Sequence, residues 1–170
     1  MENITVQKLQ HQFSDAIVDV FEFRHEITIL VRREKIPDIL RFLHDDRELG
    51  YDFLADLTAI DWFQRKSRFD VVYHLRSLAH NFLIRIRTQV ADGEKVESAT
   101  SIWQTANWLE REVYDLYGIE FANHPDLRRI LTPEHWEDHP LRKDYPLVGK
   151  NEPLFIQSLE DVRDSELRLL

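Results

Sequence analysis

The sequence predicts an α+β fold: two or three helices pack on a mostly antiparallel sheet, and an extended, proline-containing C-terminal arm follows. Segments 69–76 and 82–87 alternate apolar and polar residues, which is typical of strands with one buried face. Between 101 and 117 apolar residues recur every three or four positions, which predicts a core-facing helix. Beyond residue 120 prolines recur too often for a long helix or a central strand. We therefore expect one α+β domain over residues 1–120 and an arm over 121–170, with no independent second domain.

The N-terminal part is predicted to form a helix and a hairpin. Apolar residues at helical spacing over 6–13 indicate a short amphipathic helix. Segments 16–23 and 27–31 are rich in β-branched and aromatic residues, so they predict two strands joined by a turn at 24–26.

A second helix and three further strands are predicted next. Pro37 suits the first turn of a helix, where its missing N–H would have no intrahelical partner, and Gly50 offers a stop. Segment 51–60 is apolar and is interpreted as a strand. The short connection at 77–80 predicts that the two strands beside it pair antiparallel.

The helix over 101–117 is the element with the clearest pattern. Its apolar stripe consists of Ile102, Ala106, Leu109, Val113 and Leu116. Ser101 and Gln104 have the spacing of a capping box at its start, and Gly118 suits its end. The carboxylates of this helix are expected on a solvated face or paired with Arg111.

Charge and composition exclude several function classes. The chain has 170 residues, 31 acidic and 22 basic, with a net charge of −9, which disfavours nucleic acid as a partner. With no cysteine, this chain cannot itself hold a disulfide, a thiol nucleophile or a cysteine-bound iron–sulfur cluster. No apolar run approaches the roughly 20 residues that span a bilayer, and the N-terminus lacks a secretion signal. We expect membrane contact only through another protein.

The residues predict no self-contained catalytic site. Four glycines are too few for a glycine-rich nucleotide or phosphate loop, and the serine-hydrolase elbow is absent. His135 and His139 lie four residues apart, but Glu137 fits neither order of a zinc-peptidase motif. They are interpreted as surface or contact histidines, and a metal-dependent hydrolase using them with His124 stays a rival hypothesis.

Two basic pairs stand out in the acidic chain: Arg128 with Arg129, and Arg142 with Lys143. One interpretation is internal, in which these residues pair with Glu110, Glu112 or Asp115 and pin the arm to its own domain. The other is an obligate interface with a second protein, because arginine and aromatic residues anchor buried contacts. Both can hold at once.

Three long motifs resemble a known family. They are WLEREVYDLYGIEF at 108–121, HPDLRRIL at 124–131 and HPLRKDYP at 139–146. The chain resembles the 30-kilodalton subunit family of respiratory complex I, which is the C-type subunit of bacterial NADH–quinone oxidoreductase. Blocks at 54–61 and 71–75 extend this resemblance to roughly residues 35–148.

The resemblance implies a non-catalytic core subunit of a proton-translocating NADH:quinone oxidoreductase, so this chain would belong to an enzyme without holding its active site. It would brace the peripheral arm of the complex beside the large quinone-site subunit and the iron–sulfur subunits. FMN and the iron–sulfur clusters would lie in those partner subunits, with no cofactor in this chain. The location implied is peripheral, on the cytoplasmic face of the cell inner membrane or the equivalent matrix or stromal side.

Residue by residue, the resemblance assigns structural or interface roles to the charged motif. The residues are Glu110, Arg111, Glu112, Asp115, Gly118, His124, Pro125, Asp126, Arg128, Arg129, Arg142, Lys143 and Asp144. None is expected to be catalytic, to bind a cofactor or to ligate a metal. The alternatives are the equivalent subunit of a ferredoxin-driven photosynthetic complex or of an energy-converting hydrogenase, and a stand-alone adaptor. The electron-input subunits that co-purify would separate them.

Overall fold

The computed structural model describes residues 3–150. In chain order its elements are α1 (Ile4–Gln12), β1 (Ile17–Phe23), β2 (Glu26–Val31), the 3-10 turn η1 (Arg33–Lys35), α2 (Ile36–Asp45), β3 (Phe53–Asp61), β4 (Phe69–Ser77), β5 (Phe82–Val90), β6 (Lys95–Glu97), α3 (Ala106–Tyr117) and β7 (Glu120–Ala122). The predicted arm runs past these residues, so its part beyond 150, with Pro153, lies outside the described residues. The division at residue 120 stays a prediction.

The main sheet has five strands in the order β1-β2-β5-β4-β3. The pairs β1–β2, β3–β4 and β4–β5 are antiparallel, whereas β2 and β5 run parallel. The predicted α+β fold with a mostly antiparallel sheet is confirmed. The parallel pair arises because α2, β3 and β4 intervene in the chain before β5 returns to the side of β2.

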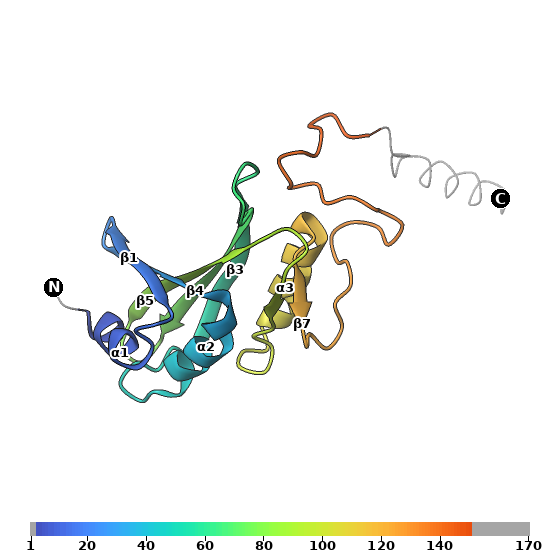
Figure 1. Ribbon diagram of the computed structural model, residues 1–170. Helices are drawn as coiled ribbons and strands as arrows, with labels where there is room; N and C mark the ends of the chain where they lie inside the picture. Colours follow the sequence, from blue (N-terminus) through green and yellow to red (C-terminus); the bar gives the residue numbers. More distant parts are fainter. Residues whose placement is uncertain (1–2, 151–170) are drawn as a thin grey trace, which may run out of the picture.

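One face of the sheet is buried against the helices. Alternate residues of β4 and β5, such as Tyr73 and Ile86, enter a single core with Leu9 of α1 and Leu40 of α2. In Figure 1, α1 and α2 lie across the sheet, while α3 and β7 stand beside its β3 edge. The alternation that predicted β5 matches this one-sided burial, whereas residues 69–73 of β4 are buried on both faces.

The predicted turns are present, with small shifts. Arg24 and His25 adopt positive φ between β1 and β2, and Glu26 already belongs to β2. Gly118 ends α3 with φ of 75°, as predicted, a backbone angle that glycine adopts without strain.

The predicted start of the third helix is wrong. The helix begins at Ala106, and no side-chain hydrogen bond caps it. The residues before it form turns, and buried Trp103 among them donates its Nε1–H to the carbonyl of Tyr51 (3.2 Å). The Ser101 hydroxyl instead lies 3.5 Å from Arg41 Nη2.

Beyond β7, residues 123–150 form turns and bends without regular secondary structure. This segment, orange to red in Figure 1, runs alongside α3. We call residues 123–150 the arm segment. Among residues 3–150, no helix combines the length and apolar character needed to cross a membrane.

Candidate functional site

Asp115 on α3 binds the first part of the arm segment. Its Oδ2 accepts hydrogen bonds from the backbone N–H groups of Ile130 (2.9 Å), Leu131 (2.7 Å) and Thr132 (2.9 Å). Its Oδ1 accepts from Arg129 Nη1 (2.8 Å) and from the Thr132 hydroxyl. A single carboxylate thus fixes four consecutive residues of the arm segment.

These bonds stabilise the charged form of a buried carboxylate. Burial alone would raise the pKa of Asp115, but the donors from Thr132, Leu131 and Ile130 outweigh burial and hold the pKa well below its usual range. Asp115 is therefore a permanent anion whose acceptor capacity is filled by its own chain. Such a group serves as an anchor rather than as a proton donor or acceptor.

The C-terminal turn of α3 is closed by the second part of the arm segment. His139 Nδ1 donates to the carbonyl of Asp115 (2.8 Å), Leu141 N to that of Leu116 (3.1 Å) and Arg142 Nε to that of Tyr117 (2.6 Å). The last carbonyls of a helix have no hydrogen-bond donors within the helix. Here the arm segment provides those donors.

Gly118 permits this close approach. A Cβ atom there would lie 2.5 Å from the His139 ring and 2.9 Å from Arg142 Nη2. Glycine is thus required both for its positive φ and for the space that the returning arm segment occupies.

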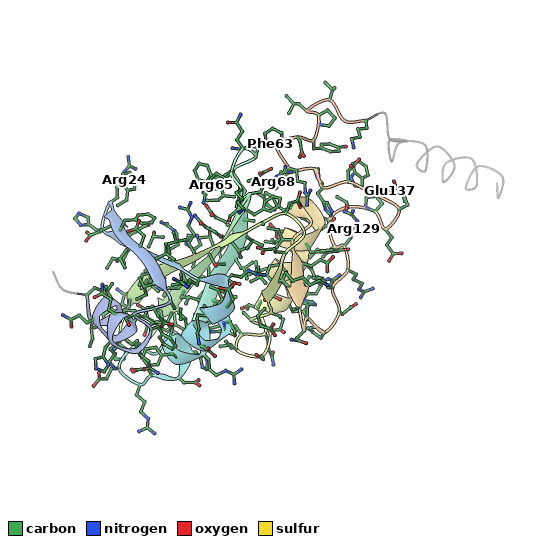
Figure 2. The ribbon with its side chains drawn as sticks, in the orientation of Figure 1. Arg24, Phe63, Arg65, Arg68, Arg129 and Glu137 are labelled. Atoms are coloured by element: carbon green, nitrogen blue, oxygen red, sulfur yellow. The ribbon has the colours of Figure 1, made fainter. Side chains whose placement is uncertain are left out.

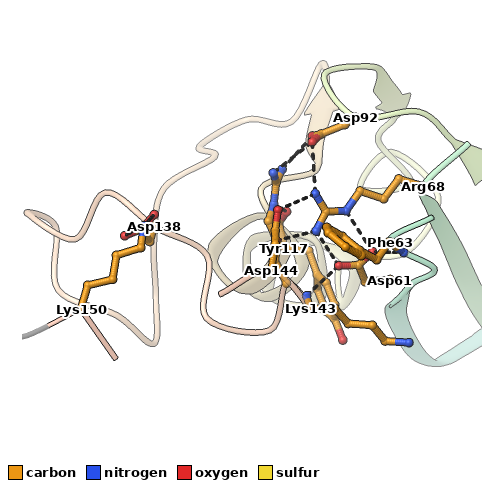
Figure 3. A network of polar contacts seen from close by, with 10 residues as sticks. Asp61, Phe63, Arg68, Asp92, Tyr117, Asp138, Lys143, Asp144 and Lys150 are labelled. Atoms are coloured by element: carbon orange, nitrogen blue, oxygen red, sulfur yellow. Dashed lines mark hydrogen bonds and ion pairs between the residues drawn. The ribbon is translucent and has the colours of Figure 1, made fainter. Parts of the chain in front are cut away.

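A second ionic network ties the arm segment to one end of the sheet (Figure 3). Arg68, just before β4, makes a two-bond pair with Asp61 at the end of β3 (2.9 and 2.7 Å) and another with Asp144 (3.0 and 2.6 Å). Arg142 pairs in the same way with Asp92, just after β5 (3.1 and 2.9 Å). We call these five residues the Arg68 network.

The carboxylate of Asp61 is the buried centre of the network. It also accepts from Lys143 N (2.8 Å). Burial would raise the pKa of Asp61, but Arg68 and the backbone amides of Lys143 and Phe63 lower it to about 2. Hydrogen bonds of this charge-assisted, two-pronged kind are the strongest in proteins and fix geometry as well as charge.

Glu110 is the one buried acid of α3 with a raised pKa. It is fully buried and accepts from Ser98 Oγ (2.7 Å) and Ala99 N (2.7 Å). Burial raises its pKa to about 7 despite these two bonds. The ring of His124 is also buried, 4.0 Å from Glu110, and its Nε2 bonds to the carbonyl of Asn107 (3.1 Å).

The structure corrects the predicted solvated face of α3. Glu110 and Asp115 are fully buried, and Arg111 is buried with them. Arg111 donates to the carbonyls of Arg128 (3.1 Å) and Arg129 (3.2 Å) rather than pairing with neighbouring carboxylates. The periodicity of the helix could not predict this burial, because these polar residues are buried by tertiary contacts with residues 98–99 and 128–132.

The interpretation that the basic pairs bind acids of their own chain is correct for one residue, and other residues pair with acids that the interpretation did not include. Arg129 pairs with Asp115, whereas Arg128 is exposed and pairs with Asp126 on the surface (2.9 Å). Arg142 and Asp144 find Asp92 and Arg68, partners that the sequence did not suggest.

The remaining predicted residues are exposed: Glu112 and Pro125 lie on the surface, as does the side chain of Lys143. Asp61, Arg68 and Asp92 were missed. The only indication in the sequence was that Asp61 ends the block at 54–61, which is one of the blocks that carry the family resemblance. Their proximity follows from the β3-β4-β5 order, which places the ends of these strands together.

The three histidines of the rival hydrolase hypothesis do not form one site. His124 and His139 each bond to a different backbone carbonyl of α3, and His135 is exposed. Between residues 3 and 150, no three histidine or carboxylate side chains gather in a way that could hold a metal ion.

Comparisons with known proteins agree with this architecture. The family described as "Respiratory-chain NADH dehydrogenase, 30 Kd subunit" matches residues 29–151. The C-type subunit of NADH-quinone oxidoreductase from Citrifermentans bemidjiense is 46% identical over 86% of this chain and 91% of its own. The protein of the same name from Geobacter sulfurreducens is 48% identical over 86% of this chain and 91% of its own.

A solved structure has the same fold. The trypsin-resistant fragment (1–134) of Nqo5 superposes with a TM-score of 0.64 and 29% identity, over 73% of this chain and 100% of that one. The predicted resemblance is confirmed: the chain belongs to the 30-kilodalton subunit family of respiratory-chain NADH dehydrogenase, or complex I.

Proposed function

We propose that this chain is a non-catalytic scaffold in the peripheral arm of an NADH:quinone oxidoreductase. The observation that carries the proposal is the use of the family motif. Three residues of the motif, Asp115, Arg129 and Arg142, bind the chain's own backbone and side chains. These residues of the family motif therefore stabilise the position of the arm segment. A rigid domain with a fixed arm segment suits a part that holds neighbouring subunits at set distances.

The proposed neighbours are the large quinone-site subunit and adjacent iron–sulfur subunits, with FMN and the clusters in those partners. The proposed position is peripheral, on the cytoplasmic face of the membrane or its matrix or stromal equivalent. The relatives named above are NADH–quinone oxidoreductase subunits, which favours NADH as donor over the ferredoxin-driven and hydrogenase alternatives.

Affinity purification from membranes tests the proposal. The tagged chain is extracted in mild detergent, and the co-purifying subunits, flavin and iron are identified. We expect a large assembly with an NADH-oxidising module. A hydrogenase module would support the closest alternative, and a lone 20.4 kDa protein would contradict the scaffold function.

A further inference from the structure

We propose that the loop between β3 and β4, completed by Lys143 of the arm segment, docks an acidic segment of another protein subunit. The docking residues are Trp62, Phe63, Arg65, Lys66 and Lys143, which we call the loop patch. This inference rests on the proposed scaffold function and specifies one of its contacts. Figure 2 shows Phe63 and Arg65 on this loop, at the end of the sheet nearest the arm segment.

Two aromatic side chains of the loop patch face solvent. Trp62 is 41% exposed and Phe63 is 50% exposed. Large aromatic residues are the commonest anchors of protein interfaces, because they bury much apolar area at a small entropic cost. Leaving both in water is unfavourable unless a partner covers them.

The loop holds these aromatics in place before any partner arrives. Trp62 N donates to the carbonyl of Arg68 (2.8 Å), and the indole Nε1–H donates to buried Asp70. Phe63 N donates to Asp61 (2.8 Å), and the Arg68 guanidinium lies 5.2 Å from the Phe63 ring centre. A patch fixed in this way loses little conformational entropy on binding.

Positive charge surrounds the indole. The charged groups of Arg65, Arg87 and Lys143 lie 5.4, 5.7 and 5.9 Å from the Trp62 ring centre. Asp70 neutralises part of this charge by pairing with both arginines. Lys66 and Lys143 form no ion pair with any residue between 3 and 150.

This local excess of positive charge occurs in a chain with a net charge of −9. Charge complementarity therefore favours a segment whose carboxylates pair with the lysines. Apolar side chains of the same segment would pack on the aromatic rings.

Docking of the arm segment completes the loop patch. The backbone N–H of Lys143 bonds to Asp61, and the neighbouring Asp144 pairs with Arg68, so the ammonium group of Lys143 is carried to the indole. The Arg68 network thus joins the internal arm contacts to an outward-facing binding surface (Figure 3).

The chain offers a matched control at the opposite end of the sheet. Phe23 at the β1–β2 turn is 65% exposed and carries Arg24 5.2 Å from its ring centre. Exposed Glu22 and Glu26 flank this pair, so it lacks an excess of positive charge. In Figure 2, Arg24 lies on the β1–β2 hairpin and Arg65 on the loop between β3 and β4.

The experiment is a competition between tagged variants and the untagged wild-type chain expressed in the same cells. Lys66→Glu with Lys143→Glu is expected to reduce the tagged share of the purified complex about tenfold, and Trp62→Ala is expected to reduce it as well. Arg24→Glu with Phe23→Ala is expected to match the tagged wild-type chain. Equal incorporation of all variants would refute the loop patch while leaving the scaffold function intact.

A cross-linking amino acid at position 63, in an otherwise wild-type chain, identifies what covers the patch. We expect one cross-link, to a peptide of another subunit rich in Asp and Glu. Changing those acids to lysine should restore incorporation of the Lys66→Glu, Lys143→Glu chain. A cross-link to a neutral or basic segment, or charge-dependent binding of the purified chain to phosphatidylglycerol vesicles, would overturn the proposal. Failure of the tagged wild-type chain to enter a complex would instead refute the scaffold function and the patch with it.

Discussion

Asp115 occupies a position that is electrostatically unfavourable for an acid. It lies near the C-terminal end of α3, where the helix dipole is negative, and it is fully buried. Three backbone amides, one hydroxyl and Arg129 compensate for both penalties. The residue is tolerated because the arm segment is bound to it.

Asp115→Asn tests this anchor. The amide is similar in size but removes the negative charge opposite Arg129, so we expect a loss of about 2–4 kcal/mol in the free energy of unfolding. Limited proteolysis should cut the arm segment faster. Asp126→Asn, which breaks an exposed pair, should change stability by less than about 1 kcal/mol. Equal effects of the two substitutions would contradict the anchor.

Glu110 makes stability depend on pH in the opposite sense to most acids. Its pKa is about 7 in the folded chain against 4.5 for an ordinary glutamate. Between these values the folded chain keeps a proton that the unfolded chain has lost, so this group's contribution to stability falls as pH rises. The loss is complete above pH 7.

Glu110→Gln removes this titration. Relative to wild type, the variant should gain about 2–3 kcal/mol in unfolding free energy between pH 4.5 and 8, measured by urea titration with tryptophan fluorescence. Glu112→Gln, exposed on the same helix, should show no such gain. Parallel pH profiles for the wild type and Glu110→Gln would show that the Glu110 carboxyl has the same pKa in the folded and unfolded chain, which would contradict this prediction.

At the scale of elements, the end of α3 depends on glycine at position 118, where the arm segment packs closely. Gly118→Ala adds a methyl group against His139 and Arg142, and Gly93→Ala adds one at a similar φ of 81° with no atom within 4 Å. The second substitution should cost about 1 kcal/mol of backbone strain. The first should cost about 1–3 kcal/mol more, since packing must also give way.

Thermal unfolding of both glycine variants measures the difference. In a His139→Ala background, which removes the nearest contact, Gly118→Ala should cost less stability than it does in the wild-type chain. Equal destabilisation at positions 93 and 118 would mean that the arm segment does not press on the end of α3.

Elements with a local pattern were predictable, and those fixed by distant contacts were not. The apolar–polar alternation predicted both β4 and β5, and in β5 it follows from the burial of one face. The start of α3 was misplaced because Trp103 reaches Tyr51, a contact across 52 residues that no local spacing reveals. The parallel pairing of β2 with β5 is non-local for the same reason.

The same limit applies to the candidate site. The pair of Arg129 with Asp115 was among the internal pairings that the sequence left open, because both residues lie in a dense charged motif. Arg68 was not among them, since its partners Asp61 and Asp144 lie 7 and 76 residues away. Nothing in the sequence around a basic residue that precedes a strand indicates which distant acids it will pair with.

At the scale of the whole molecule, the Asp115 contacts and the Arg68 network bind the arm segment at two points, one along α3 and one at the end of the sheet. Residues 129–132 and 142–144 of the arm segment are thereby fixed relative to the domain, and the loop patch is formed at the second point. A neighbouring subunit therefore meets one rigid body rather than a domain and a loose tail.

The most direct test of this account is the turnover of the assembled complex that carries Arg129→Ala, with Arg128→Ala as the control. We predict less assembled complex with Arg129→Ala, with NADH:quinone turnover per assembled complex unchanged and flavin-site reduction of an artificial acceptor intact. Arg128→Ala, on the surface, should keep the internal contacts of the arm segment. Full assembly with lost turnover in Arg129→Ala would contradict the account, because the motif would then act in the chemistry rather than in the shape.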